Sequence, residues 1–182
     1  MKKFLTLILS VMMFNSVGAK TMKTETATLA GGCFWGMEEI IRAIPGVTKT
    51  VVGYSGGTID NPNYGIVKLG QSNHAESVEV VFNPEKISYA DLLGYFFRMH
   101  DPTTLNQQGN DKGTQYRSVI FYHSPEQKKT AEEVINKVNA SKKWEKPVVT
   151  QVIPVTKFYA AEDYHQDYLQ KNKGGYTCHW LR

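Results

Sequence analysis

Residues 25–54 read ETATLAGGCFWGMEEIIRAIPGVTKTVVGY, and they predict a strand, a helix and a second strand in succession. The first six residues form a short strand candidate that ends in a pair of glycines. From Phe34 onwards, apolar side chains recur at the spacing of one helix face, and a Pro-Gly pair stops the helix. Residues 47–54 then read as a strand, because they are rich in β-branched side chains.

The remainder of the chain continues this alternation of strands and helices. Ser88 and Ser124 each occupy the N-cap position of a predicted helix, and Ser124 opens a Ser-Pro-Glu-Gln capping box. In chain order we expect a strand at 77–82, a helix over 89–97, a strand at 119–122, a helix at 125–138, a strand at 148–155 and a helix at 160–171. This order predicts an α+β fold, a two-layer α/β sandwich with a ferredoxin-like (split βαβ) core and its helices on one face.

Three long polar segments separate these elements, at 55–74, at 99–115 and from 173 onwards. They are rich in Gly, Asn, Asp and Thr, and they show neither a helix nor a strand pattern. Loops of this length inside a compact domain are usually functional or disordered. We therefore expect long loops around a functional site.

The composition excludes several classes of protein. The chain has 182 residues, which is enough for one domain with a core of its own. Hydrophobic residues make up 41% and charged residues 21%, which argues against a disordered or fibrous chain. Only two cysteines are present, which excludes disulfide scaffolds and Cys-rich zinc modules. A net charge of +4 without a basic stripe gives no reason to expect binding to nucleic acid. The five histidines lack metal-ligand spacing, so we expect no metal site. We expect no other cofactor.

The N-terminus has the features of a secretory signal peptide. Two lysines are followed by an apolar run over residues 4–14 and by small residues up to Ala19. The run is short and interrupted by polar residues, so we favour cleavage after Ala19 over an uncleaved membrane anchor. Residues 29–33 faintly resemble a lipoprotein cleavage box, but charged residues separate them from the apolar run, and we exclude lipidation.

Cleavage of a signal peptide at 1–19 would leave residues 20–182 as a single domain with a flexible C-terminal tail at about 172–182. We expect the processed chain to be exported to the periplasm, to act as a monomer and to have no membrane association. In such an oxidising compartment two cysteines can pair.

Cys33 is the residue around which the chemistry concentrates. It stands where a predicted helix begins, and unpaired backbone N–H groups and the helix dipole favour an anion there. We therefore expect its thiol to ionise more readily than a free thiol. A buried core residue or half of a structural disulfide would fit the position equally well. The adjacent Phe34 and Trp35 favour a reactive thiol, because on a helix they cannot both share a face with Cys33 and one of them should border the sulfur.

The sequence around Cys33 resembles a known active-site signature. Residues 31–36, GGCFWG, are similar to the signature of the A-type peptide methionine sulfoxide reductases. Further stretches that resemble this family, in the family's order, are GYSGG at 53–57, NPNY at 61–64, HAE at 74–76, QGNDKGTQYRS at 108–118 and AEDYHQ at 161–166. One departure is Asn73, where the family usually has glycine; asparagine also tolerates a left-handed backbone, so the turn can survive.

The resemblance implies a role for each matched residue. Cys33 would be the nucleophile that attacks the sulfoxide sulfur, and Glu76 the acid that protonates the oxygen. Tyr64 and Tyr116 would donate hydrogen bonds to that oxygen, where negative charge develops. A proton donor that works near neutral pH needs a raised pKa, which an apolar pocket would give to Glu76.

The resemblance also covers the pocket and the second cysteine. Phe34 and Trp35 would hold the methyl group of the substrate, and Asp111 would help to order the site. Cys178 lies in a glycine-bearing segment near the C-terminus, where the family often carries the cysteine that resolves the sulfenic acid into a disulfide. A fixed structural bridge remains the alternative for Cys178.

The family therefore implies a thiol-dependent enzyme that repairs oxidative damage. Its substrates would be oxidised proteins or free methionine S-sulfoxide, and its electron donor a thioredoxin-like protein. Two alternatives stay open at this point. One is a Cys-His hydrolase in which His74 or His165 is the base, and the other is a secreted binding module held by a Cys33–Cys178 bridge.

Overall fold

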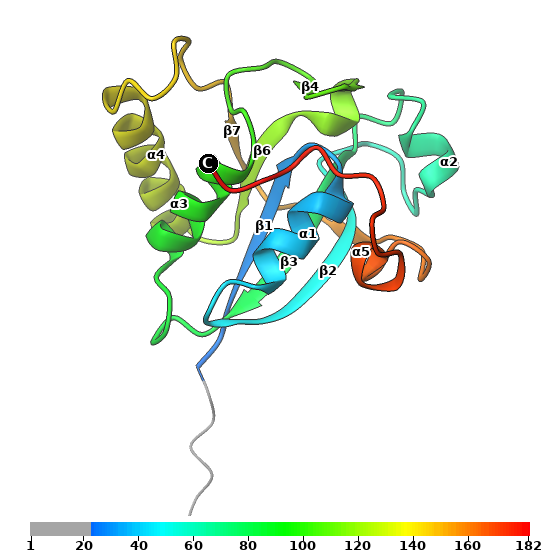
Figure 1. Cartoon of the computed structure of the whole chain (residues 1–182), viewed down its shortest axis with the longest axis horizontal. Coiled ribbons are helices and arrows are strands. Elements are labelled where there is room, and N and C mark those ends of the chain that lie inside the picture. Colours follow the sequence, from blue (N-terminus) through cyan, green and yellow to red (C-terminus); the bar gives the residue numbers. More distant parts are fainter. Residues whose placement is uncertain (1–22) are drawn as a thin grey trace, which may run out of the picture.

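A six-stranded sheet forms the centre of the part of the chain that the structure, a computed structural model, describes: residues 23–182 (Figure 1). The predicted signal peptide at 1–19 lies outside these residues. The strands of the sheet are β1 (Glu25–Gly31), β2 (Val47–Ser55), β3 (Ala75–Phe82), β6 (Ser118–Tyr122), β7 (Gln151–Pro154) and β8 (Phe158–Ala160). Their order across the sheet is β7-β6-β1-β3-β2-β8, and neighbours are antiparallel except β6 and β7, which are parallel.

Four helices lie between these strands in the sequence, and a fifth follows the last strand. They are α1 (Phe34–Arg42), α2 (Tyr64–Val67), α3 (Tyr89–Met99), α4 (Pro125–Ala140) and α5 (Tyr168–Lys171), and a 3-10 turn at Thr114–Tyr116 follows a small hairpin of β4 (Gln107–Gln108) and β5 (Asp111–Lys112). Both predicted caps are confirmed. Ser88 Oγ accepts the backbone N–H of Asp91 at 3.1 Å, and Ser124 Oγ accepts that of Gln127 at 3.2 Å.

The three longer helices, α1, α3 and α4, cover one face of the sheet (Figure 1). Alternation along the strands separates the two faces, because successive side chains of a strand point in opposite directions. Leu29 and Ile120 belong to the main core beneath the helices, whereas Ala30 and Phe121 belong to a smaller apolar cluster. The predicted combination of a sheet with helices is confirmed as a mixed α/β fold, and the ferredoxin-like (split βαβ) core stays a prediction. Four strands, β6, β1, β3 and β2, form the middle of the sheet, and β7 and β8 add one strand at each edge.

The predicted helix at 160–171 is wrong for most of its length. Only Tyr168–Lys171 is helical, and residues 158–160 pair with β2 instead. The side chain of Gln166 accounts for the difference, since its Oε1 accepts the N–H of Val52 and its Nε2 donates to the carbonyl of Val52, both at 2.9 Å. Asp167 then adopts a left-handed φ of 54°, which an α-helix does not allow.

Parts of all three long polar segments lie together at one end of the molecule. The loop with α2, the β4–β5 hairpin and the C-terminal segment all lie near the end of the sheet where α1 begins (Figure 1). The last residue, Arg182, is fixed to α3, since its N–H donates to the carbonyl of Arg98 at 2.9 Å and its own carbonyl accepts from Arg98 Nε at 2.8 Å. The tail is thus docked in this structure, and its flexibility stays a prediction. Within residues 23–182, no helix has the length and apolar character needed to cross a membrane.

Candidate active site

Cys33 occupies the N-cap position of α1, immediately after β1 and two glycines. Gly32 has a φ of 112°, a conformation that L side chains rarely adopt, so glycine is needed for the turn from strand to helix. The Cys33 side chain is only 6% exposed. The turn therefore presents a nearly buried thiol at the start of the helix.

The prediction that the helix start makes this thiol more acidic is wrong. Burial raises the pKa of Cys33 well above that of a free thiol, and the nearby carboxyl group of Glu76 raises it further. The backbone N–H of Trp35 lowers the pKa, but its effect is smaller than that of burial. The N–H of Phe34 donates to Glu76 Oε2 at 3.1 Å. Cys33 is therefore a neutral thiol in the resting protein.

Glu76 is a buried acid beside Cys33. It is the second residue of β3, on the side of the strand that faces the helices, and it is 2% exposed. Burial raises its pKa to about 8; the hydrogen bond from Phe34 opposes this rise and the charge of Asp111 adds to it. The direction agrees with the prediction. At neutral pH Glu76 therefore holds a proton that it can donate.

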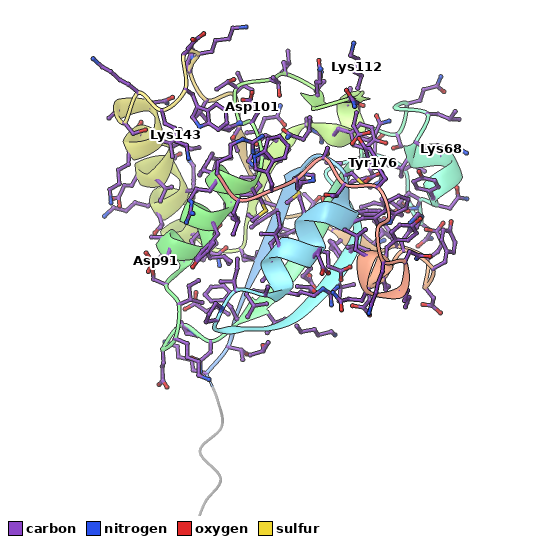
Figure 2. The ribbon with its side chains drawn as sticks, in the orientation of Figure 1. Lys68, Asp91, Asp101, Lys112, Lys143 and Tyr176 are labelled. Atoms are coloured by element: carbon purple, nitrogen blue, oxygen red, sulfur yellow. The ribbon has the colours of Figure 1, made fainter. Side chains whose placement is uncertain are left out.

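A cavity of about 130 Å³ opens beside Cys33. The residues that line it are Cys33, Phe34, Trp35, Tyr64, Glu76, Asp111, Tyr116 and Tyr176. Every residue predicted for catalysis or substrate binding, except Cys178, thus meets in one place. Tyr176, which comes from the C-terminal segment and lies beyond the start of α1, completes the wall (Figure 2). A space of this size admits the end of one side chain.

Two tyrosines supply neutral donors at this cavity. Tyr64 begins α2 and Tyr116 ends the 3-10 turn, so different loops bring them to the same wall. Burial, followed by the charge of Glu76, raises the pKa of both hydroxyls. Both tyrosines therefore keep their protons and can donate hydrogen bonds to an oxygen atom in the cavity.

The aromatic wall is fixed by contacts outside the cavity. Phe34 is 1% exposed and belongs to the main core as well as to the cavity. The ring of Trp35 stacks on Tyr168 with centroids 3.7 Å apart, and its Nε1 donates to His165 Nδ1 at 3.0 Å. These contacts hold both rings in place, so the wall is rigid before any substrate arrives.

Cys178 lies outside the cavity but next to its edge. Its Sγ donates to Asp111 Oδ2 at 3.2 Å, and the backbone N–H of Cys33 lies close enough to lower the pKa of the Cys178 thiol. Burial and the Asp111 carboxylate outweigh that effect and raise this pKa to about 12. Both cysteines are free thiols in this structure.

The model of the peptide methionine sulfoxide reductase family matches residues 25–181. The chain belongs to this family. Peptide methionine sulfoxide reductase MsrA 2 of Rhodopirellula baltica is 54% identical to it over 159 residues, which cover 87% of this chain and 92% of the relative. Reduced Mxr1 from Saccharomyces cerevisiae has a TM-score of 0.84 and 39% identity, covering 92% of this chain and 97% of that one. Mxr1 in complex with Trx2 has a TM-score of 0.61 and 28% identity, covering 92% of this chain and 96% of that one.

Membership of the methionine sulfoxide reductase family makes the chain an oxidoreductase and removes the two alternatives. The geometry also argues against a Cys-His hydrolase, because neither His74 nor His165 lines the cavity. Both ring nitrogens of His74 are within hydrogen-bond distance of the backbone of the loop at 57–59, and Nδ1 of His165 accepts from Trp35. Among the residues that the structure describes, no group of three or more His, Cys, Asp or Glu is placed to hold a metal ion.

Sequence reasoning missed two residues of this reductase site. Tyr176 lies two positions before Cys178, and only the docked course of the tail brings it to the cavity. Glu162 accepts the backbone N–H of Tyr64 and the hydroxyl of Tyr54, both at 2.9 Å, and so fixes the start of α2. Glu162 stands within the AEDYHQ stretch that resembles the family, which was the available signal. Asn73 has the left-handed φ of 57° that its replacement of glycine predicted.

Proposed function

We propose that this protein reduces methionine S-sulfoxide to methionine, in proteins or as the free amino acid, with Cys33 as the nucleophile. One observation carries the proposal: a thiol, a protonated carboxyl group, two neutral hydroxyls and two fixed aromatic rings border a single small cavity. A methyl sulfoxide group consists of a methyl group, an electrophilic sulfur and a basic oxygen. The aromatic rings suit the methyl group, Cys33 suits the sulfur, and the donors suit the oxygen.

The first chemical step transfers oxygen from the substrate to Cys33. Glu76 donates its proton to the sulfoxide oxygen while Tyr64 and Tyr116 donate hydrogen bonds to it, which makes the sulfur more electrophilic. The Cys33 sulfur attacks the sulfoxide sulfur to form a transient sulfur–sulfur bond, and its proton passes to the Glu76 carboxylate. The protonated oxygen then moves from the substrate sulfur to the Cys33 sulfur: the substrate sulfur–oxygen bond and the sulfur–sulfur bond break, the sulfur–oxygen bond of a Cys33 sulfenic acid forms, and methionine leaves. Glu76 gives one proton to the oxygen and receives the thiol proton of Cys33, so it ends the step protonated, as it began.

The second step regenerates Cys33 through a disulfide. Cys178 attacks the sulfenic acid on Cys33, a Cys33–Cys178 disulfide forms and water leaves. The position of Cys178 beside the backbone of Cys33 supports this assignment. A thioredoxin-like dithiol then reduces the disulfide and is oxidised in turn. The complex of the yeast relative Mxr1 with the thioredoxin Trx2 supports this class of donor.

The place of action belongs to the same proposal. The support for export is the sequence of residues 1–19, with its two lysines, its apolar run and its small residues before Ala19. An exported reductase would repair proteins oxidised outside the cytoplasm. N-terminal sequencing of the mature protein tests the cleavage, and a chain that keeps residues 1–19 would refute cleavage after Ala19. Recovery of the protein in the cytoplasmic fraction would refute export.

Turnover of a methyl sulfoxide peptide by Cys178→Ser, compared with wild type, tests the chemistry. The variant should produce about one equivalent of methionine and then stall with a thioredoxin-like donor. Mass spectrometry should find oxidised Cys33 and no intramolecular disulfide. Its melting temperature should match that of the reduced wild type, since the two thiols form no structural bridge there. Sustained fast cycling of Cys178→Ser with the same donor would show that another group resolves the sulfenic acid.

A further inference from the structure

His179 follows Cys178 directly, and the reaction described above gives it no part. Its imidazole is 6% exposed, although it belongs to the last few residues of the chain. Nε2 lies 2.8 Å from the carbonyl oxygen of Gly31, and Nδ1 lies 3.4 Å from the Sγ of Cys178. The ring therefore bridges the second thiol and the backbone two residues before Cys33.

These contacts fix the tautomer of His179. A backbone carbonyl oxygen can only accept a hydrogen bond, so Nε2 must carry the hydrogen that it shares with Gly31. In a neutral imidazole the other nitrogen then has a lone pair, and this lone pair faces the Cys178 thiol. Burial lowers the pKa of His179 to about 4, which keeps the ring neutral at neutral pH.

Two glycines make room for the ring beside α1. A Cβ on Gly36, which lies in the first turn of α1, would overlap Thr177 Oγ1 and come within 2.7 Å of His179 Nδ1. A Cβ on Gly32 would lie 3.0 Å from His179 Cε1. Thr177 Oγ1 also accepts the backbone N–H of His179 at 3.1 Å. The segment 177–179 is thus seated on the bare backbone at the start of α1.

We propose that His179 is a positioning residue for the resolving step. It ties the segment that carries Cys178 to the segment that carries Cys33, and it holds the Cys178 sulfur within reach of a sulfenic acid on Cys33. Asp111 Oδ2, at 3.2 Å, is an alternative acceptor for the one hydrogen of this thiol, so the sulfur lies between two acceptors and can donate to either. A disulfide needs Cα atoms about 4.4–6.8 Å apart, so small losses of placement matter here.

The bonds made and broken are those of the second step. The bond between the sulfurs of Cys178 and Cys33 forms, the sulfur–oxygen bond of the sulfenic acid breaks, and the Cys178 proton leaves with the hydroxide as water. His179 gains and loses no proton overall. The inference rests on the proposed function, because it requires Cys178 to be the resolving thiol.

Three variants test the role of His179. His179→Phe keeps a ring of similar size but removes both nitrogens. His179→Gln keeps an N–H donor near the position of Nε2, which can reach the Gly31 carbonyl. Gly36→Ala leaves His179 intact and pushes its segment away from α1, while alanine favours the helix by about 1 kcal/mol over glycine and so should preserve the fold.

Each reduced variant is mixed with a stoichiometric methyl sulfoxide peptide and quenched over time. Methionine formed reports the first step, loss of both thiols reports the disulfide, and dimedone labelling reports the sulfenic acid. In His179→Phe, we expect methionine release within about twofold of wild type and disulfide formation about tenfold slower, which is the effect of losing roughly one hydrogen bond. In Gly36→Ala, which also shifts the neighbour of the wall residue Tyr176, disulfide formation should slow more than methionine release. Dimedone-labelled Cys33 should accumulate, and His179→Gln should regain part of the rate.

The outcomes separate this inference from the function on which it rests. Disulfide formation at the wild-type rate in His179→Phe, or an equal loss in both steps, would overturn the positioning role. Equal rates in His179→Gln and His179→Phe would overturn the role of the Gly31 anchor. If His179→Phe does not fold, a wild-type disulfide rate in Gly36→Ala overturns the inference. If Cys178→Ser itself cycles like wild type, the assignment of Cys178 has failed.

Discussion

Replacing Glu76 by glutamine should stabilise the protein and at the same time slow its reduction step. Glutamine has nearly the same shape, and its amide oxygen can still accept the backbone N–H of Phe34, which bonds Glu76 at 3.1 Å. It carries no ionisable group, so the folded protein no longer bears the cost of an acid held away from water. A residue with only a structural role would give the opposite sign for stability.

The magnitude follows from the pKa of Glu76, which burial raises from 4.5 to about 8. Between these pH values the folded protein keeps a proton that the unfolded chain has lost. The stability from this group is therefore complete below pH 4.5 and is lost as the pH rises towards 8. Since one pKa unit is worth about 1.4 kcal/mol, the loss is about 1 kcal/mol at pH 5 and about 3 kcal/mol at pH 7. Glu76→Gln should gain these amounts relative to wild type.

Urea unfolding of the reduced proteins at both pH values measures the gain, and single-turnover reduction of a methyl sulfoxide peptide measures the loss. The reduction step should slow by roughly 10²–10⁴, the usual contribution of a general acid. Glu79→Gln is the matched control, because Glu79 lies on the same strand with its side chain on the opposite face and outside the cavity. A stability difference that does not grow between pH 5 and pH 7 would refute the buried-acid reasoning, and an unchanged single-turnover rate would assign the proton to another group.

Further predictions concern the nucleophile and the two hydroxyls. Cys33→Ser should release no methionine yet keep the wild-type melting temperature, and measurable turnover would exclude Cys33 as the nucleophile. Because burial raises the pKa of Cys33, iodoacetamide should alkylate it only at a higher pH than a free cysteine, as followed by mass spectrometry; faster labelling at low pH would contradict this. Tyr64→Phe and Tyr116→Phe should each slow single-turnover reduction modestly and the double variant much more, since either hydroxyl can partly replace the other. Effects that simply multiply would argue for independent roles.

Local patterns predicted the centre of the fold because the determining contacts there are local. The apolar spacing of α1 and the caps at Ser88 and Ser124 lie within a few residues of the elements they define. The segment 160–171 failed because its decisive bonds are distant in sequence. Tyr164 and Tyr168 have helical spacing, but Gln166 bonds to Val52 across the sheet edge, and no pattern within the segment reveals that partner.

For the candidate site, too, some properties could be predicted from the sequence and others could not. The resemblance to a family brought together Glu76, Tyr64 and Tyr116, each of which alone reads as an ordinary polar or aromatic residue. The acidity of Cys33 was predicted from a local feature, the start of a helix, and burial reversed it. Burial is set by the docked tail and the surrounding loops. A prediction that uses only the neighbouring residues in the sequence therefore cannot include the effect of burial on the pKa of Cys33.

The origin of the cavity walls has a consequence for protein synthesis. The walls come from residues 33 to 176, so nearly the whole chain must be present before the cavity exists. The pairing of β1 in the sheet is complete only after β6 has been made, because Thr28 of β1 pairs with Phe121 of β6. The cavity wall is complete only after Tyr176 has been made. During translation the thiol of Cys33 is therefore made early and enclosed late. Activity should appear only after the C-terminal segment has been made and has docked, and no N-terminal fragment should show it.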